Sequence, residues 1–243
     1  LNFMKNRNVL ILGGSSDIGI EVVKNFLELK WNVHAHYLKN KRNLIILKKK
    51  YKSLKIIKFN FNDYKSLKVE NNLKKKFNKN YDSVVNLVGY TDNISFEKTN
   101  FKSLIKSLTT NAIVPILLEK ILVKKMLVKK WGRILNCSSI GVKFGGGNNS
   151  FNYSFSKHCL EFIPSSHKQW AKKNVLINNL RIGVTNTKIH KRMKTKLQIK
   201  DRIKLIPINR MAEPKEIANY IISLTTEKNS YITGQTLAAS GGE

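Results

Sequence analysis

Short apolar runs alternate with amphipathic segments along this chain of 243 residues. The run Asn8–Leu12 ends at a glycine, as buried parallel strands often do, and Ile20–Lys30 after it has the spacing of an amphipathic helix. Further strands are predicted at Trp31–Tyr37, Leu54–Phe59, Tyr81–Val88, Arg133–Cys137, Val175–Leu180 and Gln235–Ala238. Further helices are predicted at Asp63–Phe77 with Asp63 as N-cap, at Phe101–Lys130, around Tyr153, at Thr187–Leu205 and at Pro214–Leu224.

This alternation contains no internal repeat and no linker. It predicts a single α/β domain over residues 1–243, doubly wound and of Rossmann type, with a parallel seven-stranded sheet. Asn111 and Pro115 lie in the middle of the longest predicted helix, so we expect a kink or another irregularity there.

The formal net charge of +30 is the most unusual feature of the composition. Strongly basic proteins bind nucleic acids, anionic membrane surfaces or acidic partners. Here the lysines are spread from Lys5 to Lys228, and asparagine and isoleucine are abundant with them, which favours a compositional bias over a selected polyanion site. A nucleic-acid-binding protein on the same scaffold is the alternative from a different functional class.

The cysteines and the apolar runs argue against several other classes of protein. Cys137 and Cys159 are too few for a disulfide scaffold, and no cysteine or histidine has a second ligand at metal spacing. No apolar run approaches the roughly 18 residues of a membrane span. The first apolar run is also too short for the core of a signal peptide. We therefore expect a cytoplasmic protein with reduced thiols and no metal.

A glycine-rich turn, Gly13–Gly19, lies between the first predicted strand and the first predicted helix. This order makes a glycine motif credible for dinucleotide binding, because glycines permit a tight turn and the helix N-terminus offers N–H groups to a pyrophosphate. An ordinary strand–helix turn is the simpler alternative.

The second predicted strand ends at Tyr37 without the acidic residue that would hold the ribose 2′-hydroxyl of NAD. Lys39, Lys41 and Arg42 follow instead, and their charges suit a 2′-phosphate. NADP(H) is therefore favoured, with NAD(H) as the alternative. In so basic a chain, lysines that only fill the surface would give the same pattern.

Tyr153 and Lys157 are four residues apart in a predicted helix, so their side chains project from the same face. A neighbouring cation favours the phenolate and lowers the pKa of a tyrosine, which makes the phenol a usable proton donor and acceptor. A catalytic role for this pair becomes more credible because Ser138-Ser139 and the glycine-rich turn precede it in the sequence.

These motifs occur in the order found in the classical subgroup of the short-chain dehydrogenase/reductase superfamily, which the chain resembles over essentially its full length. The segments that carry the resemblance are Gly13–Gly19, Asn86–Gly89, Gly183–Thr187, Arg210–Ala218 and Tyr231–Gly242, and the last implies a complete C-terminus. The catalytic residues it implies are Asn111, Ser139, Tyr153 and Lys157. The cofactor-binding residues it implies are Gly13, Ser15, Ser16, Asp17, Ile18, Gly19, Tyr37, Lys39, Asn60, Phe61, Asn86, Val88, Gly89, Tyr153, Lys157, Gly183, Thr185 and Thr187.

Several positions depart from the family pattern. Asp17 replaces the middle glycine of the turn and brings negative charge close to the expected pyrophosphate. Leu87 and Val88 replace an Asn-Ala pair, and Ile182 replaces a proline. Asn60 stands where an aspartate that contacts adenine is usual. These differences bear on cofactor affinity and preference, whereas the four catalytic residues are intact.

The resemblance implies hydride transfer between a nicotinamide and a carbonyl carbon. Tyr153 would protonate the carbonyl oxygen, and Lys157 would lower the pKa of the phenol and bind the nicotinamide ribose. Ser139 would orient the carbonyl, and Asn111 would hold a water in the proton path.

Within the family, the chain is most similar to 3-oxoacyl-[acyl-carrier-protein] reductases, with Lys130 and Lys168 where those enzymes meet the acidic carrier protein. The polar loop Gly145–Asn149 suits a sugar or nucleotide-sugar precursor of cell-surface polysaccharide equally well. The resemblance also implies a homotetramer or a dimer, paired through long helices near Phe101–Lys130 and Phe151–Lys172. Thr187–Leu205, which is rich in cations, is expected to form a lid over an anionic substrate.

Overall fold

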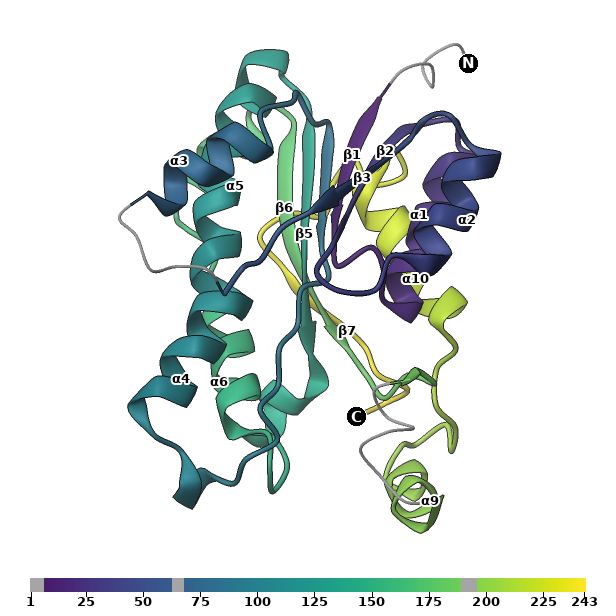
Figure 1. Ribbon diagram of the computed structural model, residues 1–243, viewed down its shortest axis with the longest axis vertical. Helices are drawn as coiled ribbons and strands as arrows, with labels where there is room; N and C mark the ends of the chain where they lie inside the picture. Colours follow the sequence, from purple (N-terminus) through teal and green to yellow (C-terminus); the bar gives the residue numbers. More distant parts are fainter. Residues whose placement is uncertain (1–6, 63–67, 189–195) are drawn as a thin grey trace.

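A parallel sheet forms the centre of the protein (Figure 1). The structure is a computed structural model that describes residues 7–62, 68–188 and 196–243. Its sheet has 7 strands in the order β3-β2-β1-β4-β5-β6-β7, and every neighbouring pair is parallel. The strands are β1 Asn8–Leu12, β2 Asn32–Tyr37, β3 Leu54–Lys58, β4 Ser83–Asn86, β5 Gly132–Ser139, β6 Val175–Ile182 and β7 Thr236–Ala239. The predicted doubly wound α/β fold is confirmed.

Helices cover both faces of the sheet (Figure 1). One face carries α1 Asp17–Glu28, α2 Arg42–Lys50 and α10 Pro214–Thr225. The other carries α3 Val69–Lys76, α4 Phe101–Leu108, α5 Val114–Lys129 and α6 Phe151–Leu160. Shorter or peripheral helices are η1 Phe96–Lys98, η2 Thr109–Ile113, η3 Ile140–Phe144, α7 His167–Ala171 and α9 Lys196–Lys204. Within the described ranges, no helix is both long and apolar enough to cross a membrane.

Alternate residues of the central strands supply the two cores. Val9 and Ile11 of β1 pack with the helices α1 and α10, whereas Leu10 and Leu12 pack with α3 and α5. Successive strand side chains point to opposite faces, so a strand with helices on both sides needs apolar residues at every position. The apolar run that predicted β1 is continuous because this strand is buried on both faces.

Helix α1 begins at Asp17, three residues before the predicted start. Ser16 is the N-cap, and its Oγ accepts a hydrogen bond from the Gly19 N–H at 3.0 Å. Because Ser16 caps the helix, the last polar residues of the glycine-rich turn form its first turn. Those residues lack the apolar periodicity on which the prediction relied.

Other helix predictions need correction. Helix α2 was not predicted, because only Leu44 in it is buried and its last turn is all lysine. The single helix predicted over Phe151–Lys172 is wrong: α6 and α7 are separate, and Pro164 lies between them, where it cannot continue a helix. The predicted N-cap Asp63 lies outside the described residues, and the described helix α3 begins at Val69.

The irregularity expected in the longest helix is confirmed. A π-helical turn, η2, joins α4 to α5. Pro115 has no N–H to donate to the carbonyl of Asn111 four residues earlier, so the regular α-helical pattern cannot pass through this point. The wider turn places Asn111 in the interior, where it is fully buried.

A row of buried, hydrogen-bonded polar side chains connects two strands of the sheet to α5. Asn86 of β4 and Asn136 of β5 are register partners, and the Asn86 Nδ2 donates to the Asn136 Oδ1 at 3.0 Å. Asn136 also hydrogen-bonds the carboxyl group of Glu119 on α5, whose Oε1 has no partner among the described residues. Burial therefore raises the pKa of Glu119 to about 7.

We predict that Glu119→Gln changes the pH dependence of stability. The folded pKa of Glu119 is raised from 4.5 to about 7, so its carboxyl group favours folding fully below pH 4.5 and loses that contribution as the pH rises to 7. Across that window the free energy of unfolding of the variant should gain about 3 kcal/mol relative to the parent. Urea unfolding at several pH values measures this difference. Glu28→Gln, an exposed substitution on α1, is the control. The prediction would be contradicted if the free energy of unfolding of both variants, relative to the parent, did not change with pH.

Candidate active site

Lys157 lies buried at the carboxyl edge of the sheet. Its Nζ donates to the carbonyl oxygens of Val88, which follows β4, and of Cys137 in β5, each at 2.7 Å. The side chain comes from α6, so one ammonium group connects this helix to two strands. Burial lowers the pKa of Lys157 to about 8. The two carbonyl dipoles are what stabilise the charged form in an interior position.

Tyr153 lies beside this ammonium group on the same helix. The Lys157 Nζ is 6.0 Å from the centroid of the Tyr153 ring. The loop after β4 closes the other side of the ring, because a Cβ added at Gly89 would lie 3.7 Å from the Tyr153 Cε2. The expected neighbourhood of Tyr153 and Lys157 is therefore present in the structure.

The structure does not show the lowering of the Tyr153 pKa that was expected from Lys157. Burial raises the pKa of Tyr153 to about 12, and a hydrogen bond from Ser139 opposes the rise only in part. The phenolate would lose more hydration in this interior position than its neighbours return. The phenol consequently stays protonated at neutral pH.

Of the two serines, Ser139 contacts the phenol and Ser138 does not. Ser139 is the N-cap of η3, where its Oγ also accepts from the Gly141 N–H at 3.1 Å. Ser138 is buried, and its Oγ lies 3.5 Å from the Lys157 carbonyl oxygen. The alternation of side chains along the strand separates the two hydroxyl groups.

Asn111 has a structural role that the sequence did not reveal. Its Oδ1 accepts from the Tyr90 N–H at 2.7 Å, and its Nδ2 donates to the Tyr90 carbonyl at 2.9 Å and to the Ser156 Oγ at 2.8 Å. The Ser156 hydroxyl in turn donates to the Tyr153 carbonyl at 2.7 Å. Both amide protons of Asn111 are thus used by protein groups, and only its Oδ1 retains a lone pair for a water.

The glycine-rich turn is a tight cradle at the start of α1. Gly13 has a φ of +74°, and an added Cβ there would lie 2.7 Å from the Leu87 carbonyl oxygen. At Gly19 an added Cβ would lie 2.4 Å from the Gly13 carbonyl oxygen, so neither position accepts a side chain. The first-turn N–H groups of α1, including those of Asp17 and Ile18, have no helical acceptor. With Ser15 beside them, these groups fit a pyrophosphate.

His36 supports this turn and was missed as a functional residue. The Gly13 N–H donates to the His36 Nδ1 at 3.1 Å, so the Nε2 carries the proton and donates to the Phe59 carbonyl at 3.0 Å. Burial lowers the pKa of His36 to about 4, which keeps the ring in this neutral form. The alternation of His34 and His36 on a predicted strand was the only available signal.

Asp17 links the glycine-rich turn to a distant segment. Its Oδ2 accepts a hydrogen bond from the backbone N–H of Lys188 at 2.7 Å, and its Oδ1 is 3.8 Å from the Lys188 Nζ. This carboxylate belongs to the first residue of α1, whose N-terminus is the expected pyrophosphate position. The lysine ammonium offsets part of the negative charge that the departure from the family pattern introduced.

The residues predicted to bind the adenosine lie at the carboxyl ends of β2 and β3. Tyr37 is buried at the end of β2, and Lys39, Lys41 and Arg42 follow it in exposed positions. The Asn60 Oδ1 accepts from the Asn62 N–H at 3.0 Å, which stabilises the turn. The ring of Phe61 packs in the core between His36 and other aromatic rings, so it faces away from solvent.

The segment predicted to lie near the nicotinamide is anchored to β7. The Gly183 N–H donates to the Ala239 carbonyl at 2.9 Å, and the Thr185 Oγ1 donates to the Gly183 carbonyl at 3.0 Å. Thr187 is half-buried just beyond. Most of the predicted lid, residues 189–195, lies outside the described residues, and α9 follows it.

Two predicted carrier-contacting lysines are not brought to this site. Lys130 immediately precedes β5, and Lys168 lies in α7 just before β6, so both are exposed at the amino edge of the sheet. The four predicted catalytic residues lie at the opposite edge. In the described part of the chain, no group of His, Cys, Asp and Glu side chains is arranged to hold a metal ion.

Comparison with known proteins adds independent information. Residues 13–243 match the family model described as enoyl-(acyl carrier protein) reductase. A 3-oxoacyl-[acyl-carrier-protein] reductase of Aquifex aeolicus is 33% identical over 66% of this chain, and the match spans 64% of that relative. A 3-oxoacyl-[acyl-carrier-protein] reductase of Chlamydia trachomatis is 27% identical over 98% of this chain and 97% of its own length. The solved structure of ElxO with NADP bound is similar with a TM-score of 0.82 and 25% identity, over 97% of this chain and 98% of that one.

We predict that Asp17 protects the Lys188 amide from hydrogen exchange. Asp17→Ala removes the acceptor, so exchange of that amide should become about tenfold faster, as expected for one lost charge-assisted hydrogen bond. Asp17→Asn keeps an oxygen acceptor without the charge and should give an intermediate rate. NMR-detected exchange at constant pH measures both. The same rate in all three proteins would show that the contact is absent in solution.

Proposed function

Because this chain belongs to the short-chain dehydrogenase/reductase family, we propose that it is an NADPH-dependent carbonyl reductase acting on a 3-oxoacyl thioester. The observation that carries the proposal is the position of the Tyr153 phenol. It lies between the Ser139 hydroxyl and the buried Lys157 ammonium group, at the same sheet edge as the cradle of α1. A proton donor and a dinucleotide cradle at one edge are the two components that carbonyl reduction requires.

The chain's own residues fit a bound NADP(H), which would supply the hydride. The cradle at Gly13–Gly19 offers backbone N–H groups to the pyrophosphate. Lys39, with Lys41 and Arg42, supplies positive charge for the 2′-phosphate at the end of β2. Lys157 uses two of its three N–H donors on carbonyl groups, which leaves one for the nicotinamide ribose. The NADP found in ElxO supports this assignment.

The proton chemistry follows from the two pKa values. With a pKa of about 12, Tyr153 is protonated at neutral pH, which is the form needed to donate a proton to a carbonyl oxygen. The Ser139 hydroxyl can polarise the same oxygen. Lys157, with a pKa of about 8, is close enough to ambient pH to return a proton to the phenolate. The structure is therefore suited to the reductive direction.

The substrate class rests on the relatives. Both reductases reported above act, by name, on 3-oxoacyl groups carried by acyl-carrier protein. Lys188, together with Lys200, Arg202 and Lys204 of α9, follows the nicotinamide-side segment and would favour an anionic, phosphopantetheine-linked substrate. Contact of the carrier with Lys130 and Lys168 stays a prediction, since both lie at the other sheet edge.

We also propose that the chain self-associates through the layer of α4, α5 and α6. Large apolar side chains are exposed there, including Phe101 at 81% and Phe155 at 40%. Ile113 and Ile116 are exposed beside them. Exposed large apolar side chains on one layer of helices are typical of an interface between subunits. A homotetramer or a dimer would bury it.

We predict that Tyr153→Phe abolishes turnover but preserves cofactor binding. The substitution removes the proton donor, and general acid catalysis is typically worth ~10²–10⁴-fold in kcat. The phenyl ring keeps the packing against Gly89. Steady-state reduction of acetoacetyl-coenzyme A with NADPH, together with the Kd of NADP, measures the effect. Tyr220→Phe, an exposed change on α10, is the control, and activity of Tyr153→Phe within a few-fold of it would refute the assignment.

We predict that the enzyme prefers NADPH over NADH through the cations after β2. Replacing Lys39, Lys41 and Arg42 with Gln should lower the ratio of kcat/KM for the two cofactors by roughly 10–100-fold, since three charges near the 2′-phosphate are lost. The matched control replaces Lys74, Lys75 and Lys76 of α3, which removes the same charge elsewhere. A parent enzyme that uses NADH as well as NADPH would contradict the prediction.

A further inference from the structure

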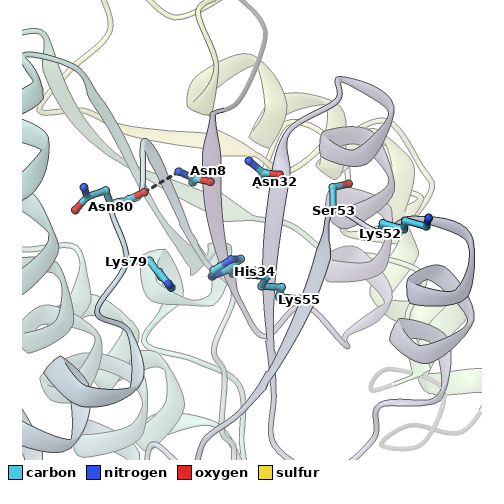
Figure 2. A pocket seen from close by; sticks show the side chains of 8 residues that line it. All are labelled: Asn8, Asn32, His34, Lys52, Ser53, Lys55, Lys79 and Asn80. Carbon is cyan, nitrogen blue, oxygen red and sulfur yellow. Dashed lines mark hydrogen bonds between the residues drawn. The ribbon is translucent and has the colours of Figure 1, made fainter.

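A polar pocket of about 300 Å³ opens at the amino edge of the sheet, opposite the candidate active site (Figure 2). It lies where β1 and β2 begin, between the loop that leads into β3 and the loop that leads into β4. One wall is fixed by a hydrogen bond from the Asn8 Nδ2 to the Asn80 carbonyl at 3.0 Å. Its size falls at the lower end of the range for small-molecule sites.

The charge around this pocket is positive and is not balanced locally. Lys52 and Lys79 line it from the loops before β3 and β4, Lys55 lines it from the start of β3, and none of its described lining residues is acidic. None of the ion pairs found among the described residues involves these lysines. The neighbouring carboxylate of Asp82 is already used by the Asn8 N–H at 2.8 Å and by Lys129.

His34 contributes a buried wall of the pocket. Its Nδ1 is 2.8 Å from the Tyr81 hydroxyl oxygen. Burial raises the pKa of Tyr81, so the phenol keeps its proton, and the His34 Nδ1 is the acceptor found for it in the described chain. Burial and the charges of Lys55 and Lys79 lower the pKa of His34 to about 4, so the ring is neutral. The Nε2 therefore carries the hydrogen of the neutral ring, on a residue that lines the pocket.

The other lysines near this edge have a different explanation. Lys48, Lys49 and Lys50 end α2, and Lys74, Lys75 and Lys76 end α3, where cations complement the negative end of the helix dipole. The pocket lysines lie beyond the C-caps of these helices, so helix dipoles do not account for them. Lys55 and Lys79 lie close enough to His34 to lower the pKa of its ring, and this local concentration of positive charge favours an anionic ligand.

We propose that this pocket binds the phosphate group of a small molecule. The lining supplies ammonium groups, an imidazole N–H, the amide of Asn32 and the hydroxyl of Ser53, all of which can donate to phosphate oxygens. A phosphate has several acceptor oxygens and up to two negative charges, so it satisfies donors from opposite walls at once, and lysine is a common partner for it. The site is separate from the one proposed for NADP(H), and its occupancy does not depend on the reductase activity.

The test follows the imidazole resonance of His34 by NMR, assigned with a His34→Gln variant. Ribose 5-phosphate, inorganic phosphate and ribose are titrated at constant ionic strength. Ribose 5-phosphate should shift the resonance saturably and ribose should not. Saturable binding of inorganic phosphate with equal affinity would support recognition of the phosphate group and identify the free ion as a sufficient ligand.

Two triple variants separate a built site from general charge attraction. Replacing Lys52, Lys55 and Lys79 with Gln should weaken binding at least about tenfold, whereas replacing Lys74, Lys75 and Lys76 with Gln should change it less than about twofold. All six side chains are exposed, so both variants should fold. No saturable shift in the parent, equal weakening in both variants, or a shift with an RNA oligonucleotide alone would overturn the proposal.

Discussion

The burial of one ammonium group organises the candidate active site. Lys157 donates hydrogen bonds to two backbone carbonyls, at Val88 and Cys137. The carboxyl ends of β4 and β5 must therefore both lie within reach of one ammonium group on α6. The same contacts place Tyr153, one helical turn earlier, against Ser139 and the loop at Gly89. If either carbonyl moved, a buried charge would lose a partner, which is far more costly than the loss of an exposed ion pair.

Neighbouring polar networks hold those strand ends in place. The Asn86 Oδ1 accepts from the Val88 N–H at 3.1 Å, and its Nδ2 reaches across to Asn136, which connects to Glu119. On the other side of Tyr153, Asn111 ties the loop at Tyr90 to Ser156. Such networks specify one arrangement of the interior because each member would otherwise be an unsatisfied polar group. They also explain why so many asparagines lie in the core of this protein.

The apolar runs predicted every strand, most directly for β1, which is buried on both faces and apolar at Val9–Leu12. Amphipathic periodicity was less informative where lysine fills the surface, so α2 escaped prediction and the break at Pro164 was overlooked. Motif spacing predicted that Tyr153, Ser139 and Lys157 come together. Their electrostatics could not be predicted, because the pKa of Tyr153 depends on how much water the folded chain excludes. The contact between Asp17 and Lys188 joins residues far apart in sequence, and no local pattern signals it.

The central claim is that Lys157 and Tyr153 promote transfer of a hydride from NADPH to a carbonyl carbon. The most direct test is the deuterium content of the alcohol formed from acetoacetyl-coenzyme A when both hydrogens at nicotinamide C4 of NADPH are deuterium. Mass spectrometry should find one deuterium on the carbinol carbon of the product of the parent enzyme. A folded Lys157→Met variant should form this product at least ~10²-fold more slowly. Failure of the parent to label the alcohol, or an equal rate in the variant, would contradict the account.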